Sequence, residues 1–389
     1  MPIHPILVAG GGIAGLAGAL ALARGGRATR VLEKAGAFET VGAGLQIGPN
    51  AVRALKFLGA WEKVAAASFA PPHIVVRDGR NGKILQKIAL GPDFESRFGE
   101  PYRVIHRADL LEGLLEQAKE LGLIELVTNA EVKGFTDRGS YVEVTLPSGA
   151  QHGEALLGAD GIRSLIRHGL GHEAVLRRRE QILFRALTFL DRPLTDHLAA
   201  VTLWLCRRGH IVHYPVKGGR ALNIVAATTG RWESEEWSAP ATRQEILTHF
   251  TQIHEHLFDV LAITPHWHKW AAADLVPLAS WSRNRATLIG DSAHAALPYL
   301  AQGAAMALED AVTLARCTLR GDTIAEAFAA YEHLRKPRTA RIAAASLNLS
   351  RAYHASGPLR LARNAVLRLT DSSRFLDRMA WIYGFDSAA

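Results

Sequence analysis

Glycines cluster near the start of the chain, directly after a short apolar run, and an acidic residue follows at a fixed distance. Gly10, Gly12 and Gly15 come after residues 6–9, and Glu33 ends the next apolar run. Gly10 permits a tight turn, Gly12 lets a pyrophosphate approach the backbone, and Gly15 lets a helix pack against the strand. Glu33 would accept hydrogen bonds from a ribose 2′-hydroxyl. A chance glycine turn is the alternative, but the spacing predicts a strand, turn and helix that bind a dinucleotide.

Two further turns place an aspartate after an apolar stretch. Asp160 lies in the segment 158–164 (Gly-Ala-Asp-Gly-Ile-Arg-Ser), and Asp291 lies in the segment 290–294 (Gly-Asp-Ser-Ala-His). Shortly after Asp291, a turn from Pro298 to Gly303 opens an expected helix from 304 toward 315. The first amides of a helix have no partner within it, so this turn could direct free N–H groups at a bound anion.

A histidine and a tyrosine alternate along one expected strand. In residues 208–215, strand geometry puts His210, Val212 and Tyr214 on one face, with Ile211 and His213 on the other. Either side chain could exchange a proton with a ligand, or could be a hydrogen-bonded residue of an ordinary sheet. Alternation alone leaves open which face meets the ligand.

The composition is that of a globular protein with more than one structural unit. The chain has 389 residues, 48% hydrophobic and 21% charged, and no apolar run approaches a membrane span. The net charge of +8 is scattered, so we expect no nucleic-acid binding and prefer attraction of small anions. Cys206 and Cys317 have no metal-type spacing and lie far apart in sequence, so neither a metal site nor a disulfide framework is expected. With no apolar run long enough to span a bilayer and no signal-peptide pattern, the default location is the cytoplasm.

The expected elements divide the chain into discontinuous units. Residues 1–70, 101–170 and 284–320 have nucleotide-domain character, whereas 71–100 and 171–283 predict a mostly antiparallel sheet, and 321–389 a helical segment. The sheet would hold a hairpin around 80–82, strands at 181–190, 201–206, 211–216 and 221–227, and one helix near 242–256. Asp109 and Glu112 form a capping-box pattern that predicts a helix over 110–119.

Taken together, these motifs resemble those of the single-component FAD-dependent aromatic hydroxylases, the group that contains salicylate hydroxylase, 3-hydroxybenzoate 6-hydroxylase and 6-hydroxynicotinate 3-monooxygenase. The likeness runs essentially end to end. It includes residues 41–50 (Val-Gly-Ala-Gly-Leu-Gln-Ile-Gly-Pro-Asn), 106–110 (His-Arg-Ala-Asp-Leu), 297–304 (Leu-Pro-Tyr-Leu-Ala-Gln-Gly-Ala) and the tail from 357–360 to 381–384.

The resemblance implies an α/β fold. A discontinuous Rossmann-like FAD-binding domain of the GR2 type would carry an inserted, mostly antiparallel substrate domain and a C-terminal helical segment. It also implies noncovalent FAD, with Asp291 at the ribityl chain, Asp160 serving FAD and pyridine nucleotide, and free amides of the turn at the flavin. The cofactor-binding residues would be Gly10, Gly12, Gly15, Glu33, Gly44, Gln46, Arg107, Val132, Asp160, Asp291, Pro298, Gly303 and Ala304.

The implied reaction inserts one oxygen atom from O2 into a small hydroxylated aromatic or N-heteroaromatic acid through a flavin C4a-hydroperoxide, with NADH or NADPH as transient co-substrate. No second glycine fingerprint provides a separate pyridine-nucleotide domain. Named members of the resembled group have a His and a Tyr at the positions of His210 and Tyr214, so this face is taken as catalytic. Tyr214 would contact the substrate hydroxyl, and His210 would orient the substrate or relay its proton.

The exact substrate stays open. Pro298 stands where 3-hydroxybenzoate 6-hydroxylase has a polar amide, Gln302 also differs, and spacing alone singles out no carboxylate-binding arginine. A flavin reductase or dehydrogenase without oxygen insertion, and a non-enzymatic FAD-binding redox sensor, are the alternative functions. The C-terminal helices could pack on the FAD domain or form the face of a homodimer.

Overall fold

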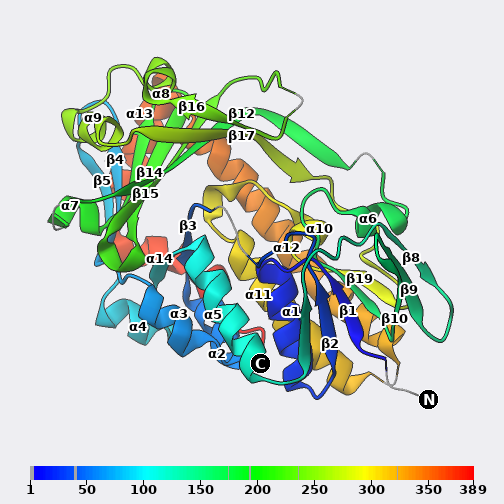
Figure 1. Cartoon of the computed structure of the whole chain (residues 1–389). Coiled ribbons are helices and arrows are strands. Elements are labelled where there is room, and N and C mark those ends of the chain that lie inside the picture. Colours follow the sequence, from blue (N-terminus) through cyan, green and yellow to red (C-terminus); the bar gives the residue numbers. More distant parts are fainter. Residues whose placement is uncertain (1–3, 39–41, 174, 192–193, 235, 322) are drawn as a thin grey trace.

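A six-stranded sheet forms the base of the nucleotide-binding part of the molecule (Figure 1). The computed structural model describes residues 4–38, 42–173, 175–191, 194–234, 236–321 and 323–389, so Val41 of the glycine-rich motif lies outside it. The strand order is β18-β19-β11-β1-β2-β7, and every neighbouring pair except β18 with β19 is parallel. The strands are β1 (Ile6–Ala9), β2 (Thr29–Leu32), β7 (Ile124–Val127), β11 (Leu156–Gly158), β18 (Ser282–Arg283) and β19 (Ala286–Leu288).

Helix α1 (Ile13–Arg24) is buried along nearly its whole length, because it lies between the sheet, α5 (Arg107–Glu120) and α11 (Gly303–Arg320) (Figure 1). Its sequence is rich in alanine, leucine and glycine, which suits a helix that is enclosed on most sides. A Cβ on Gly15 would lie 1.9 Å from the carbonyl oxygen of Gly10, and one on Gly18 would lie 2.6 Å from Leu157. Glycine is therefore required at position 15 for the helix to pack this closely on the turn, whereas a Cβ at position 18 would only displace the end of the Leu157 side chain.

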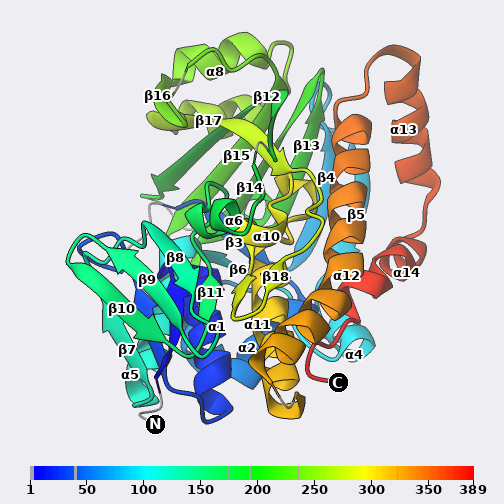
Figure 2. The ribbon, with the colours of Figure 1, turned by 90° about the vertical axis from the view of Figure 1, so that its right-hand side faces the viewer.

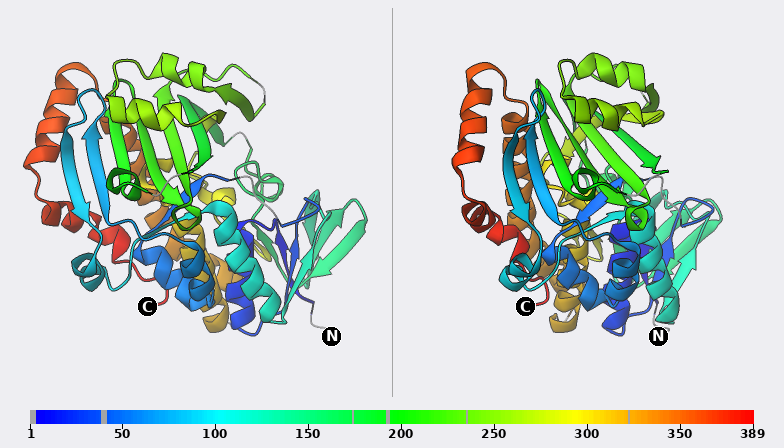
Figure 3. Two further views of the ribbon diagram at one scale, coloured as in Figure 1. Left: turned by 60° about the vertical axis from the view of Figure 1, so that its left-hand side comes forward. Right: turned by 90° about the vertical axis from the view of Figure 1, so that its left-hand side faces the viewer.

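The second large sheet has eight strands in the order β16-β17-β12-β15-β14-β13-β4-β5 (Figure 3). All neighbouring pairs are antiparallel except β13 with β4, which brings the N-terminal hairpin to the sheet. The strands are β4 (His73–Asp78), β5 (Ile84–Ala89), β12 (Leu176–Phe189), β13 (Val201–Cys206), β14 (Gly209–Val216), β15 (Ala221–Thr229), β16 (Ser238–Thr242) and β17 (His266–Leu275).

One face of the eight-stranded sheet is covered by two short helices (Figure 3). Here the prediction of a single helix over 242–256 is wrong: α8 (Arg243–His249) and α9 (Glu255–Ala262) are separate. Gln252 between them adopts a left-handed φ of 54°, which ends a right-handed helix. Ile246 and Leu257 from these helices pack on Phe184 and Ile211 of the sheet. The opposite face is turned toward the nucleotide-binding part.

The predicted start of the helix near residue 110 is also wrong. Helix α5 begins at Arg107, and the His106 side chain, not Asp109, accepts the capping hydrogen bond from the amide of Ala108 at 3.3 Å. Asp109 lies in the first turn and forms an ion pair with Lys217. Asp109 therefore pairs with Lys217, which is distant in sequence, instead of capping the helix as the local pattern predicts.

The C-terminal helices span both parts of the molecule (Figure 2). Helix α12 (Ile324–Tyr353) starts with a complete capping box between Thr323 and Glu326 and packs on α11, and α13 (Gly357–Leu369) packs on β5. Helix α14 (Ser372–Tyr383) follows and returns toward α2 (Pro49–Leu58). Arg335 of α12 is fully buried, with its Nε 2.6 Å from Asp310 and its Nη2 2.8 Å from Glu309 of α11.

The remaining elements are shorter. They are the strands β3 (Gly44–Ile47), β6 (Arg103–His106), β8 (Gly134–Asp137), β9 (Val142–Leu146) and β10 (Gly149–Gly153), and the helices α2 (Pro49–Leu58), α3 (Trp61–Ala67), α4 (Pro92–Phe98), α6 (Leu165–Gly169), α7 (Asp196–Ala199), η1 (Lys217–Gly219), α10 (Asp291–His294) and η2 (Pro298–Leu300). Among the helices in the described ranges, none has the length and apolar character that crossing a membrane requires.

Candidate active site

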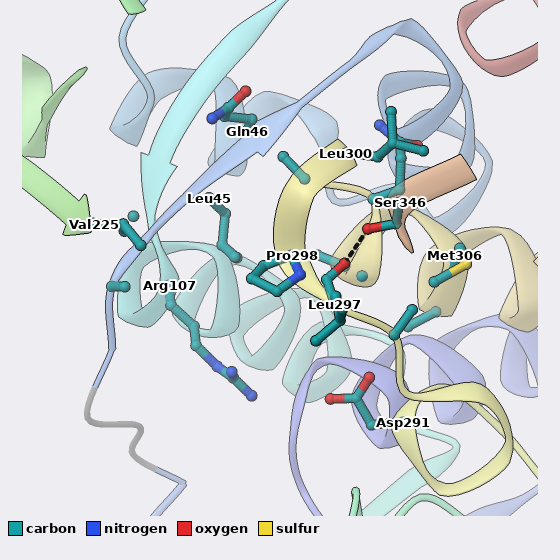
Figure 4. Close-up of a pocket in the computed structure, with 18 of the residues that line it drawn as sticks. Leu45, Gln46, Arg107, Val225, Asp291, Leu297, Pro298, Leu300, Met306 and Ser346 are labelled. Atoms are coloured by element: carbon teal, nitrogen blue, oxygen red, sulfur yellow. Dashed lines mark hydrogen bonds between the residues drawn. The ribbon is translucent and has the colours of Figure 1, made fainter. Parts of the chain in front are cut away.

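A cavity of about 280 Å³ lies between the free face of the eight-stranded sheet and the nucleotide-binding part. Its walls come from segments far apart in sequence: the turn before α1, strand β3, the start of α5, strands β12, β14 and β15, and residues 296–307 (Figure 4). The cavity therefore lies where the three glycine- and aspartate-containing turns of the sequence meet the strand that carries His210 and Tyr214.

The glycine turn leaves open space beside the cavity. Gly10 has a left-handed φ of 105°, whereas Gly12 has an ordinary φ of −75° and caps α1 without a side-chain hydrogen bond. A Cβ on Gly12 would meet no protein atom within 4 Å. Glu33 receives hydrogen bonds from the amides of Gly11 at 2.7 Å and Ala35 at 2.9 Å, one on each carboxylate oxygen. Each oxygen keeps a further lone pair that can accept a hydroxyl proton.

The N-terminus of α11 faces the same cavity. Residues 298 and 300–304 line it, and the helix starts at Gly303 with no side-chain cap on its first amides. Ala301, just before it, has a left-handed φ of 53°, an uncommon conformation for a residue with a side chain. An eighteen-residue helix concentrates partial positive charge at this end. This geometry fits a group that becomes negatively charged, as the isoalloxazine of FAD does on reduction.

Arg107 and Asp291 point into this space from opposite sides (Figure 4). The Nε of Arg107 is buried without a hydrogen-bond partner among the described residues. A buried guanidinium N–H without an acceptor is costly and indicates that a ligand atom completes the site. Open backbone at Gly12, the uncapped helix end and this unsatisfied donor together fit a bound FAD.

Asp160 and Val132 lie elsewhere in the structure. The carboxylate of Asp160 accepts hydrogen bonds from the amides of Leu165 at 2.7 Å and Ile166 at 3.2 Å, the first two residues of α6, whose N-cap is Ser164. The side chain of Val132 is buried in the core of the nucleotide-binding part. Neither side chain belongs to the cavity wall, whose nearby members are Ala159 and Gly161. Their assignment to cofactor binding remains a prediction.

The free sheet face carries His210, Val212 and Tyr214 into the cavity wall, while Ile211 packs in the core behind it. Pairing across the sheet explains which residues join them. His210 is opposite Ala227, which is opposite Leu183, and Val212 is opposite Val225, which is opposite Arg185. All of these residues line the cavity, because directly paired residues of antiparallel strands point to the same side.

Tyr214 is held against β3. A Cβ on Gly44 would lie 2.5 Å from the Tyr214 ring, and the amide of Gly44 donates to the Asn223 side chain at 2.6 Å. Burial raises the pKa of Tyr214, while Arg185 and a hydrogen bond with Gln46 act in the opposite direction. Tyr102 also donates to the oxygen of Gln46, at 2.5 Å. Tyr214 is therefore a neutral phenol that can donate or accept a hydrogen bond, and not a free base.

His210 faces different partners. Its Nδ1 lies 3.3 Å from Nε2 of His354, which also lies 3.4 Å from the hydroxyl of Tyr299. Burial, with a smaller contribution from His354, lowers the pKa of His210 to about 3, and burial lowers that of His354 to about 4. Both imidazoles are thus neutral, and a neutral imidazole can accept a proton at one nitrogen and release one at the other. Sequence reasoning missed His354, which follows the end of α12.

Arg185 was also missed. It lines the cavity from β12, its Nε is buried without a hydrogen-bond partner among the described residues, and burial lowers its pKa. Its neighbours in sequence are apolar, so only the strand pairing reveals that it shares a face with Tyr214. In the described parts of the chain, no group of His, Cys, Asp or Glu side chains could hold a metal ion.

Comparison with known proteins bears on the whole chain. The family model of the FAD binding domain matches residues 4–346. The 3-hydroxybenzoate 6-hydroxylase of Polaromonas naphthalenivorans (strain CJ2) is 38% identical over 386 residues, covering 98% of this chain and 96% of the relative. The 3-amino-4-hydroxybenzoate 2-monooxygenase PtnB3 of Streptomyces platensis is 34% identical, covering 98% and 96%. A solved salicylate hydroxylase substrate complex has a TM-score of 0.83 at 26% identity, covering 99% and 96%.

Proposed function

Since the chain belongs to the FAD-binding-domain family of flavin-dependent aromatic hydroxylases, we propose that it hydroxylates the ring of a small hydroxylated benzoic acid, such as 3-hydroxybenzoate, with NAD(P)H and O2 as co-substrates. The observation that carries this proposal is the cavity itself. One wall offers what a flavin requires, and the facing wall offers a neutral tyrosine, a neutral histidine and an arginine.

The chemistry supplied by the bound FAD is acceptance of a hydride from NAD(P)H and activation of O2. Gly12, Glu33 and the first amides of α11 would hold it, with Arg107 and Asp291 at the edge of the cavity. Gly12 directly precedes α1 and Glu33 directly follows β2, so both would meet the cofactor at the same edge of the six-stranded sheet.

The sheet wall would control the substrate hydroxyl. A phenol reacts faster with an electrophilic oxygen as its phenolate, so a proton must leave the substrate oxygen. Tyr214, kept protonated by burial, would donate a hydrogen bond to that oxygen. His210 would accept a hydrogen bond from the substrate hydroxyl at Nε2 and orient it, while its Nδ1 donates toward Nε2 of His354. The lowered pKa values of the two histidines make both imidazoles weak bases, so their role would be to position the hydroxyl and not to hold its proton.

The proposal is tested by a substrate screen with the purified, FAD-loaded protein. Hydroxybenzoates, anthranilate and hydroxynicotinates are added separately, and NADH or NADPH consumption, product and peroxide are measured together. At least one acid should stimulate reductant consumption and yield a ring-hydroxylated product. Stimulated consumption with peroxide as the only product, for every acid, would refute hydroxylation and favour a redox role without oxygen insertion.

The proposal also includes the location of the protein and its oligomeric state. We propose a cytoplasmic location, supported by two buried, unpaired cysteines, and a homodimer formed through α13. On α13, Leu359 and Leu369 expose 72% and 85% of their surface. Light scattering of the purified protein, with Leu369→Glu as the disrupting variant, tests the dimer.

A further inference from the structure

The cavity wall contains a cation without an anionic partner. Arg185 lies in the middle of β12, directly opposite Val225, which in turn is opposite Val212 of β14. Its guanidinium carbon lies 5.3 Å from the centre of the Trp270 ring, which supports one side of the group. Among the described residues, none of the ion pairs involves Arg185, and its Nε donates no hydrogen bond.

An arginine in this position requires an acceptor. Its pKa is lowered by burial and by Arg107, but the ordinary pKa of arginine is so high that the group stays charged at neutral pH. A buried cation that faces a cavity and lacks a partner costs free energy unless an anion arrives with the ligand. Asp291, which raises the pKa of Arg185, lines the cavity from α10, in the nucleotide-binding part where FAD is expected.

Arg185 and Tyr214 lie on the same face of the eight-stranded sheet, two strands apart. Adjacent strands lie about 4.8 Å apart, so the backbones of β12 and β14 are separated by roughly 10 Å across β15. Tyr214 lies two residues along β14 from Val212, on the same face as Arg185. The charge of Arg185 reaches Tyr214, because it lowers the pKa of that phenol. A guanidinium and a phenol thus line the same wall of the cavity.

We propose that Arg185 binds the ring carboxylate of the substrate and makes this enzyme select aromatic acids over neutral phenols. This inference rests on the proposed function and adds its specificity determinant. A guanidinium offers two parallel N–H donors to a carboxylate, and the pair is strong where water is excluded. With the carboxylate held at Arg185, the substrate hydroxyl would be directed toward Tyr214 and His210.

Arg185→Gln removes the charge and keeps much of the volume. Arg178→Gln, on an exposed position of the same strand, is the matched control. Dissociation constants of 3-hydroxybenzoate and 3-hydroxybenzamide are measured from the change in flavin absorbance of the FAD-loaded proteins. In Arg185→Gln, binding of the acid should weaken about 10- to 100-fold, the range for a hydrogen bond to a charged group. Binding of the amide should change less than about twofold, and Arg178→Gln should change neither.

Several outcomes would overturn the inference. Equal weakening of acid and amide would indicate a packing role, and loss of FAD or a raised KM for NADH alone would indicate a cofactor role. If Arg185→Gln does not fold, Arg185→Met replaces it; Met removes the charge and keeps an unbranched side chain, and an unchanged preference for acid over amide refutes the proposal. Failure of the proposed function would give a different result, because the wild-type protein would then bind neither 3-hydroxybenzoate nor 3-hydroxybenzamide.

Discussion

Replacing Gly12 by alanine should damage FAD binding without damaging the protein. Gly12 precedes α1 with a φ of −75° that alanine adopts freely, and a new Cβ would meet no protein atom within 4 Å. The open space is the space we assign to the diphosphate. Gly91 is the matched control, because it also caps a helix in extended conformation, with a φ of −86° and an equally open Cβ position.

The magnitude follows from the hydrogen bonds at stake. Losing a glycine N-cap costs each variant the same free energy of unfolding, about 1 kcal/mol or less. The Gly12→Ala methyl additionally pushes a diphosphate away from the turn, and one lost charge-assisted hydrogen bond of about 1.5–3 kcal/mol raises the Kd of FAD roughly 10- to 150-fold.

The assay compares the two variants as apoproteins and as FAD complexes. Thermal unfolding of the apoproteins should give equal Tm values, and quenching of FAD fluorescence should give weaker binding for Gly12→Ala alone. If Gly12→Ala and Gly91→Ala bind FAD equally well, the diphosphate does not lie against Gly12, and the assignment of the turn is wrong.

Three further predictions concern the sheet wall and the buried charges. Tyr214→Phe should keep its flavin content and slow product formation by about tenfold or more, the scale of one lost hydrogen bond in the transition state; an unchanged rate removes Tyr214 from the reaction. Arg335→Met should lower the free energy of unfolding by about 3–5 kcal/mol in denaturant titrations. The reason is that the Asp310 carboxylate, whose pKa is lowered to about 2, would stay buried and charged with one cationic neighbour fewer. A loss below about 1 kcal/mol would contradict this expectation. The pKa of His354 is lowered to about 4 in the folded chain, so its contribution to stability is present above an unfolded pKa of about 6.5 and is lost as pH falls through about 4. His354→Gln should therefore flatten the loss of stability between pH 6.5 and 4, and parallel curves would show that His354 titrates normally beside His210.

The fold class was predictable because its signals are local. The glycine turn, the alternation of residues 208–215 and the strand before Asp291 each need only a few neighbouring residues to be recognised, and the α/β fold they imply is confirmed. Two local signals failed where tertiary contacts decided the outcome. Asp109 pairs with Lys217 instead of capping a helix, and the segment after His249 turns at Gln252 instead of continuing.

The polar partners in the candidate site could not be predicted from spacing. His210 meets His354 across 144 positions of sequence, and Arg185 reaches the face of Tyr214 only through two strand pairings. Such contacts depend on the register between strands and on the end of a thirty-residue helix, neither of which a sequence pattern specifies. The sequence therefore allowed a cofactor site to be predicted, whereas the polar partners on its substrate-facing side could not be predicted.

The order of strands in the six-stranded sheet has a consequence for synthesis on the ribosome. Strand β1 can pair with β2 once residue 32 has emerged, but its other neighbour, β11, arrives only with residues 156–158, and β11 waits for residues 286–288. Until then the nascent chain exposes an unpaired apolar edge, which invites aggregation and chaperone binding. Yield in a heterologous host should thus respond more to slower translation and added chaperones than to changes at the surface of the finished fold.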